Sequence, residues 1–131
     1  MNLFKPLLAG ARPIDRMIAG LGAAIGISLT ILVCSQLPLH AGDLPIIVAP
    51  LGASAVLIFA VPASPLAQPW SVVGGNILSS LIGVAAYQLI PDMMVAAGVA
   101  VGLAIILMSL LRSLHPPGGA AALNAVIGSQ G

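Results

Sequence analysis

The sequence predicts an all-α membrane protein with four to five transmembrane helices. Hydrophobic residues make up 60% of its 131 residues and charged residues only 5%, whereas a soluble domain carries about 25% charged residues. The four basic and three acidic side chains are too few to cover a soluble surface, so most of this surface has to face lipid. Several apolar runs approach the roughly 20 residues that cross the hydrocarbon core as a helix. None alternates in the manner of a membrane β-barrel strand.

Four charge-free apolar runs predict the first four helices, at residues 17–37, 44–61, 70–90 and 93–111. A fifth helix is expected to begin after Pro117. The connections are rich in Pro, Gly and Asp, and each Pro removes a backbone donor that a helix needs. The first run is longer than the apolar region of a usual signal peptide, which favours a membrane helix. We expect a single transmembrane domain that comprises residues 1–131.

The basic residues predict the orientation of the chain. With four spans, all of them fall on one side of the membrane: Lys5, Arg12, Arg16 and Arg112. Asp43 and Asp92 fall on the other side. Because Lys and Arg collect on the cytoplasmic side, residues 1–16 are expected to be a cytoplasmic N-terminal segment. The chain is therefore predicted to be a multi-pass membrane protein with its N-terminus in the cytoplasm.

Small residues recur at a spacing of four along three of the predicted helices. They are Gly22 and Gly26, Gly98 and Gly102, and Gly75, Ser79 and Gly83. Small faces of this kind let helix backbones approach closely in lipid. We assign these residues to helix packing and to no chemistry.

A repeated motif links two distant parts of the chain. The sequence PLGASAVL at residues 50–57 aligns with PPGGAAAL at residues 116–123, with Pro, Gly, Ala and Leu matched at four positions. In the predicted topology the first copy enters the membrane from outside and the second from the cytoplasm. Opposite orientations are typical of an inverted repeat, in which transporters bind substrate near the midplane between interrupted helices. The fold prediction therefore includes an inverted repeat with two Pro-Gly helix mouths.

The helix mouths predict a site for a small anion. Free backbone N–H groups at a helix start favour negative charge, Gly permits close approach of a ligand, and Pro costs no hydrogen bond in the first turn. The alternative is that Pro and Gly only shape the start of each helix. Both interpretations stay open at the level of sequence.

Polar side chains inside apolar spans extend the candidate site, because in lipid they usually turn inward and mark function. The alternative for each is a hydrogen bond between helices. His115 has two candidate roles, a proton-linked switch near neutral pH or a cap that anchors the last helix at the cytoplasmic rim. The predicted substrate-binding residues are Pro50, Gly52, Ser54, Gln68, Asn76, His115, Pro116, Pro117, Gly118, Gly119 and Asn124.

Several classes of function lack support in the sequence. The net charge of +1 and the absence of a basic tract argue against nucleic-acid binding. The single cysteine, Cys34, forms no disulfide framework or thiolate cluster. His40 and His115 are predicted on opposite sides, which argues against a two-histidine metal site. No catalytic motif is present, so we expect neither enzyme activity, metal nor cofactor.

The motifs resemble the HPP family of small integral membrane proteins over residues 12–123. The resemblance rests on the sequences at residues 50–70, on GGNILSSLIGV at 74–84 and on HPPGGAAAL at 115–123. It implies a four-helix transmembrane region. Because chloroplast and cyanobacterial members are associated with nitrite, it also implies a transporter or channel for nitrite or a similar small anion in the cell inner (plasma) membrane. The alternative function is a structural or regulatory membrane subunit without transport activity.

The chain departs from the family pattern at its C-terminus. Relatives usually continue past the HPPGG helix with another apolar stretch, whereas this sequence stops at GSQG. Either the protein is naturally short or the sequence is a truncated form. The second repeat then lacks a counterpart of the helix at residues 70–90, so we expect a homo-oligomer in the bilayer in which another copy supplies the missing wall.

Overall fold

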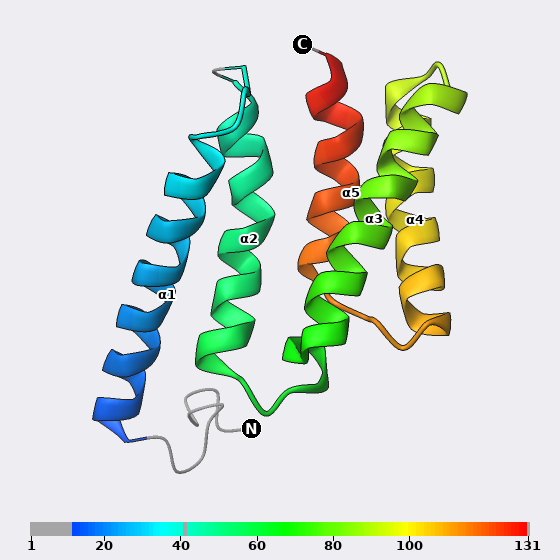
Figure 1. Cartoon of the computed structure of the whole chain (residues 1–131). Helices are drawn as coiled ribbons and strands as arrows, with labels where there is room; N and C mark the ends of the chain where they lie inside the picture. Colours follow the sequence, from blue (N-terminus) through cyan, green and yellow to red (C-terminus); the bar gives the residue numbers. More distant parts are fainter. Residues whose placement is uncertain (1–11, 41, 131) are drawn as a thin grey trace.

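The computed structural model describes residues 12–40 and 42–130, and these form five α-helices and two short 3-10 turns (Figure 1). The elements are α1 (Pro13–Cys34), α2 (Asp43–Ala60), η1 (Pro65–Ala67), α3 (Pro69–Leu89), α4 (Met93–Leu110), α5 (Pro117–Ile127) and η2 (Gly128–Gln130). Four of the helices, α1 to α4, are long and apolar enough to cross a membrane. The all-helical prediction is confirmed, while Lys5 lies outside the described residues.

The helix ends follow local chemistry, but both bounds of the first helix differ from the predicted residues 17 and 37, because α1 spans Pro13–Cys34. The sequence predicts that the first helix begins at Met17, whereas α1 begins at Pro13. Asp15 explains the earlier start, since its carboxylate accepts the backbone N–H of Arg12 at 3.0 Å and also pairs with the Arg12 guanidinium at 3.3 Å. A Pro in the first turn and an acidic group that reaches back to the N-cap both favour a helix start.

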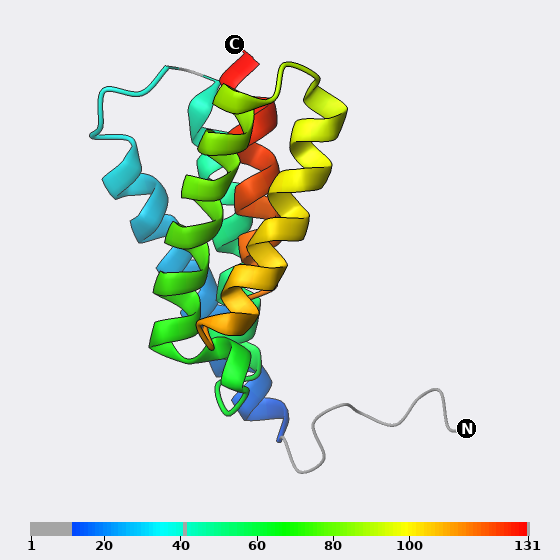
Figure 2. The ribbon, with the colours of Figure 1, turned by 90° about the vertical axis from the view of Figure 1, so that its right-hand side faces the viewer.

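The helices form two units that meet along α2 and α5. α5 packs against both α3 and α4, and these three form the larger unit (Figures 1 and 2). α1 packs mainly on α2, and α2 in turn contacts α5. α2 and α5 run in opposite directions (Figure 1), as the repeat predicts. None of the side chains of α1 is buried.

Small residues make the contact between α3 and α5 possible, as the sequence predicts. Gly75, Ser79 and Gly83 are all buried on one face of α3. A side chain at Gly83 would collide with the backbone carbonyl of Ala122 and with the side chain of Ala125 on α5. Because lipid provides no hydrophobic drive between helices, this close backbone approach supplies the packing energy.

The remaining glycine pairs have different outcomes. Gly22 and Gly26 on α1 accommodate the ring of Phe59 from α2, so their predicted packing role is confirmed. Gly98 and Gly102 on α4 have no described atom within 4 Å of the position that a Cβ would occupy. Within this chain α4 packs through its alanine face instead, with Ala96, Ala100 and Ala104 buried, so the predicted packing role of Gly98 and Gly102 stays a prediction.

The first Pro-Gly motif does not open a helix. α2 begins at Asp43, and Pro50 lies inside it. The predicted first helix mouth is therefore wrong, since the apolar residues before Pro50 already continue the helix from Asp43. The second motif does open a helix, because Pro117 is the first residue of α5 and Pro116 is its N-cap.

Candidate functional site

A buried polar cluster of Ser54, Asn76 and His115 lies where α2, α3 and the chain before α5 meet. Only 2% of Ser54 and 0% of His115 are exposed, and Asn76 is half-buried. The Ser54 hydroxyl lies 2.7 Å from His115 Nε2, and Asn76 Nδ2 donates to the same hydroxyl at 3.3 Å. Asn76 Nδ2 also donates to the Val72 carbonyl at 2.9 Å. Three predicted site residues from distant parts of the sequence are thus in contact.

His115 reaches the core because the chain turns sharply after α4. Arg112 has a positive φ of 53°, and the Ser113 N–H donates to the Met108 carbonyl at 2.8 Å, a bond that closes a helix end in the Schellman manner. The turn carries the His115 side chain inward, where it is fully buried. Its predicted place at the cytoplasmic rim stays a prediction. The ring also lies against η1, with Nδ1 at 2.8 Å from the Leu66 carbonyl. These contacts anchor the start of α5 to two other elements.

The contacts of His115 define its tautomer. A carbonyl oxygen can only accept a hydrogen bond, so Nδ1 carries the proton that is donated to Leu66. In the neutral ring Nε2 is then an acceptor, and the Ser54 hydroxyl donates to it at 2.7 Å. Ser54 also lies 3.1 Å from the Pro50 carbonyl, the acceptor of its own helix. The hydroxyl therefore has two acceptors for its single proton.

Two buried polar atoms near the polar cluster lack a hydrogen-bond partner among the described residues. They are Asn76 Oδ1 and Ser113 Oγ, and Ser113 is only 1% exposed. The amide of Asn76 cannot be turned round, because the atom that faces the Val72 carbonyl has to be a donor. Asn76 therefore presents a free acceptor. Since buried polar atoms without partners are rare, these two atoms are the groups around the polar cluster whose hydrogen bonding is incomplete among the described residues.

Pro50 and Asn124 form a second polar contact between α2 and α5. Pro50 has no N–H, so the carbonyl of Ile46 one turn earlier receives no hydrogen bond within the helix. Asn124 Nδ2 donates to this carbonyl at 2.8 Å. The helix continues through Pro50 because a side chain of α5 replaces the missing donor. Both residues belong to the predicted site, and here they join helices.

The start of α5 is closely packed. Pro117 and Gly118 are buried, and a side chain at Gly118 would lie 2.8 Å from Ser79 Oγ and 3.0 Å from Met108 Sδ. The N–H of Gly118 donates to the His115 carbonyl at 2.8 Å, and the N–H of Gly119 to the Pro116 carbonyl at 3.0 Å. The first N–H groups of α5 are thus engaged within the chain.

The other predicted site residues lie away from the polar cluster. Gln68 is exposed and donates to the carbonyls of its own connection, Pro62 and Ser64. Gly52 and Gly119 face open space rather than a neighbouring side chain. The sequence did not predict which backbone carbonyls bind the site residues, such as those of Leu66 and Val72. Every residue has a backbone carbonyl, so the sequence does not distinguish these two. It also missed Ser113, whose position two residues before His115 is a usable signal.

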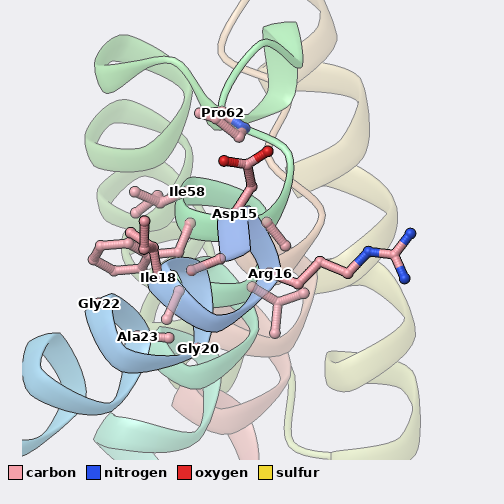
Figure 3. A pocket seen from close by; sticks show the side chains of 13 residues that line it. Asp15, Arg16, Ile18, Gly20, Gly22, Ala23, Ile58 and Pro62 are labelled. Atoms are coloured by element: carbon pink, nitrogen blue, oxygen red, sulfur yellow. The ribbon is translucent and has the colours of Figure 1, made fainter. Parts of the chain in front are cut away.

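An apolar groove of about 730 Å³ lies between the first turns of α1 and the last turns of α2 (Figure 3). Asp15 and Arg16 line its polar rim and point in different directions. The groove contains none of the residues of the polar cluster, so the two are separate features of the protein.

The polar cluster can form hydrogen bonds through uncharged groups. Over residues 12–40 and 42–130, no three His, Cys, Asp or Glu side chains lie close enough to hold a metal ion. The cluster instead offers a hydroxyl, an amide and an imidazole ring. Such groups bind small neutral or singly charged molecules without the strong trapping that a fixed opposite charge would cause.

Comparison with known proteins decides the family. The sequence matches the family described as HPP, transmembrane region, over residues 9–131. The chain belongs to the HPP family. This HPP protein is 44% identical over 90 residues to a transmembrane protein of Dictyostelium discoideum, with 66% of this chain and 32% of the relative covered. A second Dictyostelium transmembrane protein is 48% identical over 82 residues, with 60% and 26% covered.

The two relatives bear no more specific name than transmembrane protein. The HPP chain spans about a third or less of their length, 32% and 26%. No solved structure matches it. With the apolar helices α1 to α4, the family identifies a multi-pass integral membrane protein.

Proposed function

We propose that this HPP protein is a transporter or channel for a small anion, with nitrite as the favoured substrate. The observation that supports the proposal is the buried polar cluster inside otherwise apolar helices. Polar groups at membrane depth are costly and usually serve a substrate path. The resemblance to HPP proteins that are associated with nitrite supplies the candidate substrate.

The chemistry of the cluster suits a small monovalent anion. The Ser54 hydroxyl and the Asn76 amide donate hydrogen bonds without carrying charge. In the present conformation their polar atoms bind other parts of the protein. Transport therefore requires the anion to replace the contact between Ser54 and His115. A movement of α2 relative to α5 would separate these two side chains. No catalytic step is part of the proposal.

The alternative function is a structural or regulatory membrane subunit, and one observation favours it. The donors His115 Nδ1, Asn76 Nδ2 and Asn124 Nδ2 have acceptors on other elements of the protein, namely the Leu66 carbonyl, the Ser54 hydroxyl and the Ile46 carbonyl. Hydrogen bonds of this kind hold membrane helices together at about 0.6 kcal/mol each. They would persist in a protein that serves only as an assembly partner.

Orientation and assembly extend the proposal. α1 begins and α4 ends at the same end of the bundle (Figure 1), so Arg12, Arg16 and Arg112 share one side. By the positive-inside rule we place that side in the cytoplasm, and the family resemblance favours the plasma or inner membrane. The unburied faces of α1 leave room for a second copy, in line with a homo-oligomer.

Nitrite uptake by proteoliposomes of the purified protein tests the proposal, with nitrate, chloride and urea as competitors. Ser54→Ala should lower uptake about tenfold at equal folded protein, since one lost hydrogen bond to a charged group is worth about 1.5 kcal/mol or more. Ser28→Ala is the matched control, because Ser28 is exposed on α1. If folded protein gives no uptake above empty liposomes, the structural alternative replaces transport.

A further inference from the structure

Among the residues that the structure describes, the groups in contact with His115 carry no charge that could balance another charge. Its ring contacts come from Ser54 on α2 and from the carbonyl of Leu66 in η1, and its Cβ lies against Gly75 on α3. None of these groups titrates. The nearest charged residue along the chain is Arg112, which is exposed. A buried imidazolium alone, or a bound anion alone, would therefore be an uncompensated charge, which is strongly unfavourable inside a membrane protein.

The Ser54 hydroxyl lets the polar cluster accept a proton without breaking its hydrogen bonds. With neutral His115, the hydroxyl donates to Nε2 at 2.7 Å. With protonated His115, Nε2 donates to the hydroxyl, which then donates to the Pro50 carbonyl at 3.1 Å. Asn76 Nδ2 donates to the same oxygen in both cases, at 3.3 Å. The geometry is thus compatible with both protonation states.

The unpartnered atom of Asn76 gives a second, independent indication. Asn76 Oδ1 is buried without a donor among the described residues, and the Val72 carbonyl fixes the orientation of the amide. A free acceptor attracts a molecule that carries a proton and repels a bare anion. The polar cluster is therefore suited to an anion only when a proton accompanies it.

We propose that the polar cluster moves its anion together with one proton, so that each transport event is electrically neutral. The proposal rests on the proposed anion transport and adds its coupling ion. The proton is taken from one side onto His115 Nε2 or onto an oxygen of the anion. It is released with the anion on the other side. Only N–H and O–H bonds are formed and broken, and no oxidant or reductant takes part.

Parallel measurements of nitrite uptake and of membrane current test the inference on the wild-type protein. After subtraction of empty liposomes, the initial uptake rate should rise several-fold when the outside pH falls by one unit at constant inside pH. A nitrite jump on a protein-loaded supported membrane should produce no protein-dependent current. Uptake with a matching current and no response to acid would overturn proton coupling and leave anion transport standing. Absence of protein-dependent uptake would overturn both.

A pair of histidine variants assigns the proton to the polar cluster. His115→Gln keeps one donor and one acceptor on the side chain but cannot take up a proton, so its uptake should no longer rise on acidification. His40→Gln is the matched control, because the His40 side chain is 96% exposed. A merely structural role of His115 would lower uptake by the same factor at every pH. Acid stimulation that is retained in folded His115→Gln would therefore overturn the role of His115. The current measurement on the wild-type protein tests electroneutral transport without either variant.

Discussion

Replacing Asn124 by Leu should destabilise the protein only as long as Pro50 is present. Asn124 Nδ2 is the donor to the Ile46 carbonyl at 2.8 Å, and Pro50 leaves that carbonyl without a helical partner. The contact is part-buried, so the loss lies at the lower end of the range of about 1–3 kcal/mol for a buried acceptor without a donor, and hydrogen bonds between membrane helices reach at most about 1.7 kcal/mol. We therefore expect Asn124→Leu to lower the free energy of unfolding by about 1–1.5 kcal/mol.

The second arm of this experiment restores the missing donor. In Pro50→Ala, the backbone N–H of residue 50 can bind the Ile46 carbonyl, so Asn124→Leu should then cost less than about 0.5 kcal/mol. The difference, about 1 kcal/mol, is the coupling energy of a double-mutant cycle. It is measured by reversible unfolding in mixed detergent micelles. Gln88→Leu, at an exposed position of α3, controls for the change in polarity. Equal costs of Asn124→Leu in both backgrounds, within about 0.3 kcal/mol, would refute the repair of α2 by α5.

Two further predictions use glycines as matched pairs. Gly83→Val should destabilise the protein by about 1–3 kcal/mol through overpacking, because the backbone of α5 occupies that space. Gly98→Val on α4 should change the stability by no more than about 0.5 kcal/mol. Thermal unfolding in detergent measures both variants, and equal losses of stability would contradict the α3–α5 contact. Gly118→Val should reduce the yield of folded protein because Ser79 leaves no room, while Gly119→Val should fold normally. Size-exclusion profiles compare this second pair, and normal folding of Gly118→Val would show that α5 is not closely packed there.

The helices of this protein and their order could be predicted from the residues alone. Apolar runs of membrane length are a local property, and Pro and Gly between them end each helix locally, so α2, α3 and α4 begin and end within one residue of the predicted bounds. The repeat at residues 50–57 and 116–123 correctly indicated antiparallel α2 and α5. These features depend on hydrophobicity and backbone donors, which each stretch of sequence carries with it.

Which polar groups meet was settled by the packing of the helices. Ser54 and His115 are 61 residues apart, and nothing local shows that a turn at Arg112 carries His115 inward. Pro50 would be expected to mark a helix start, yet it lies within α2, because Asn124, 78 residues beyond Ile46, supplies the donor that the helix lacks. Hydrogen-bond partners across helices depend on how the helices pack. A backbone carbonyl such as that of Leu66 is common to all residues, so the sequence alone cannot identify it as a partner.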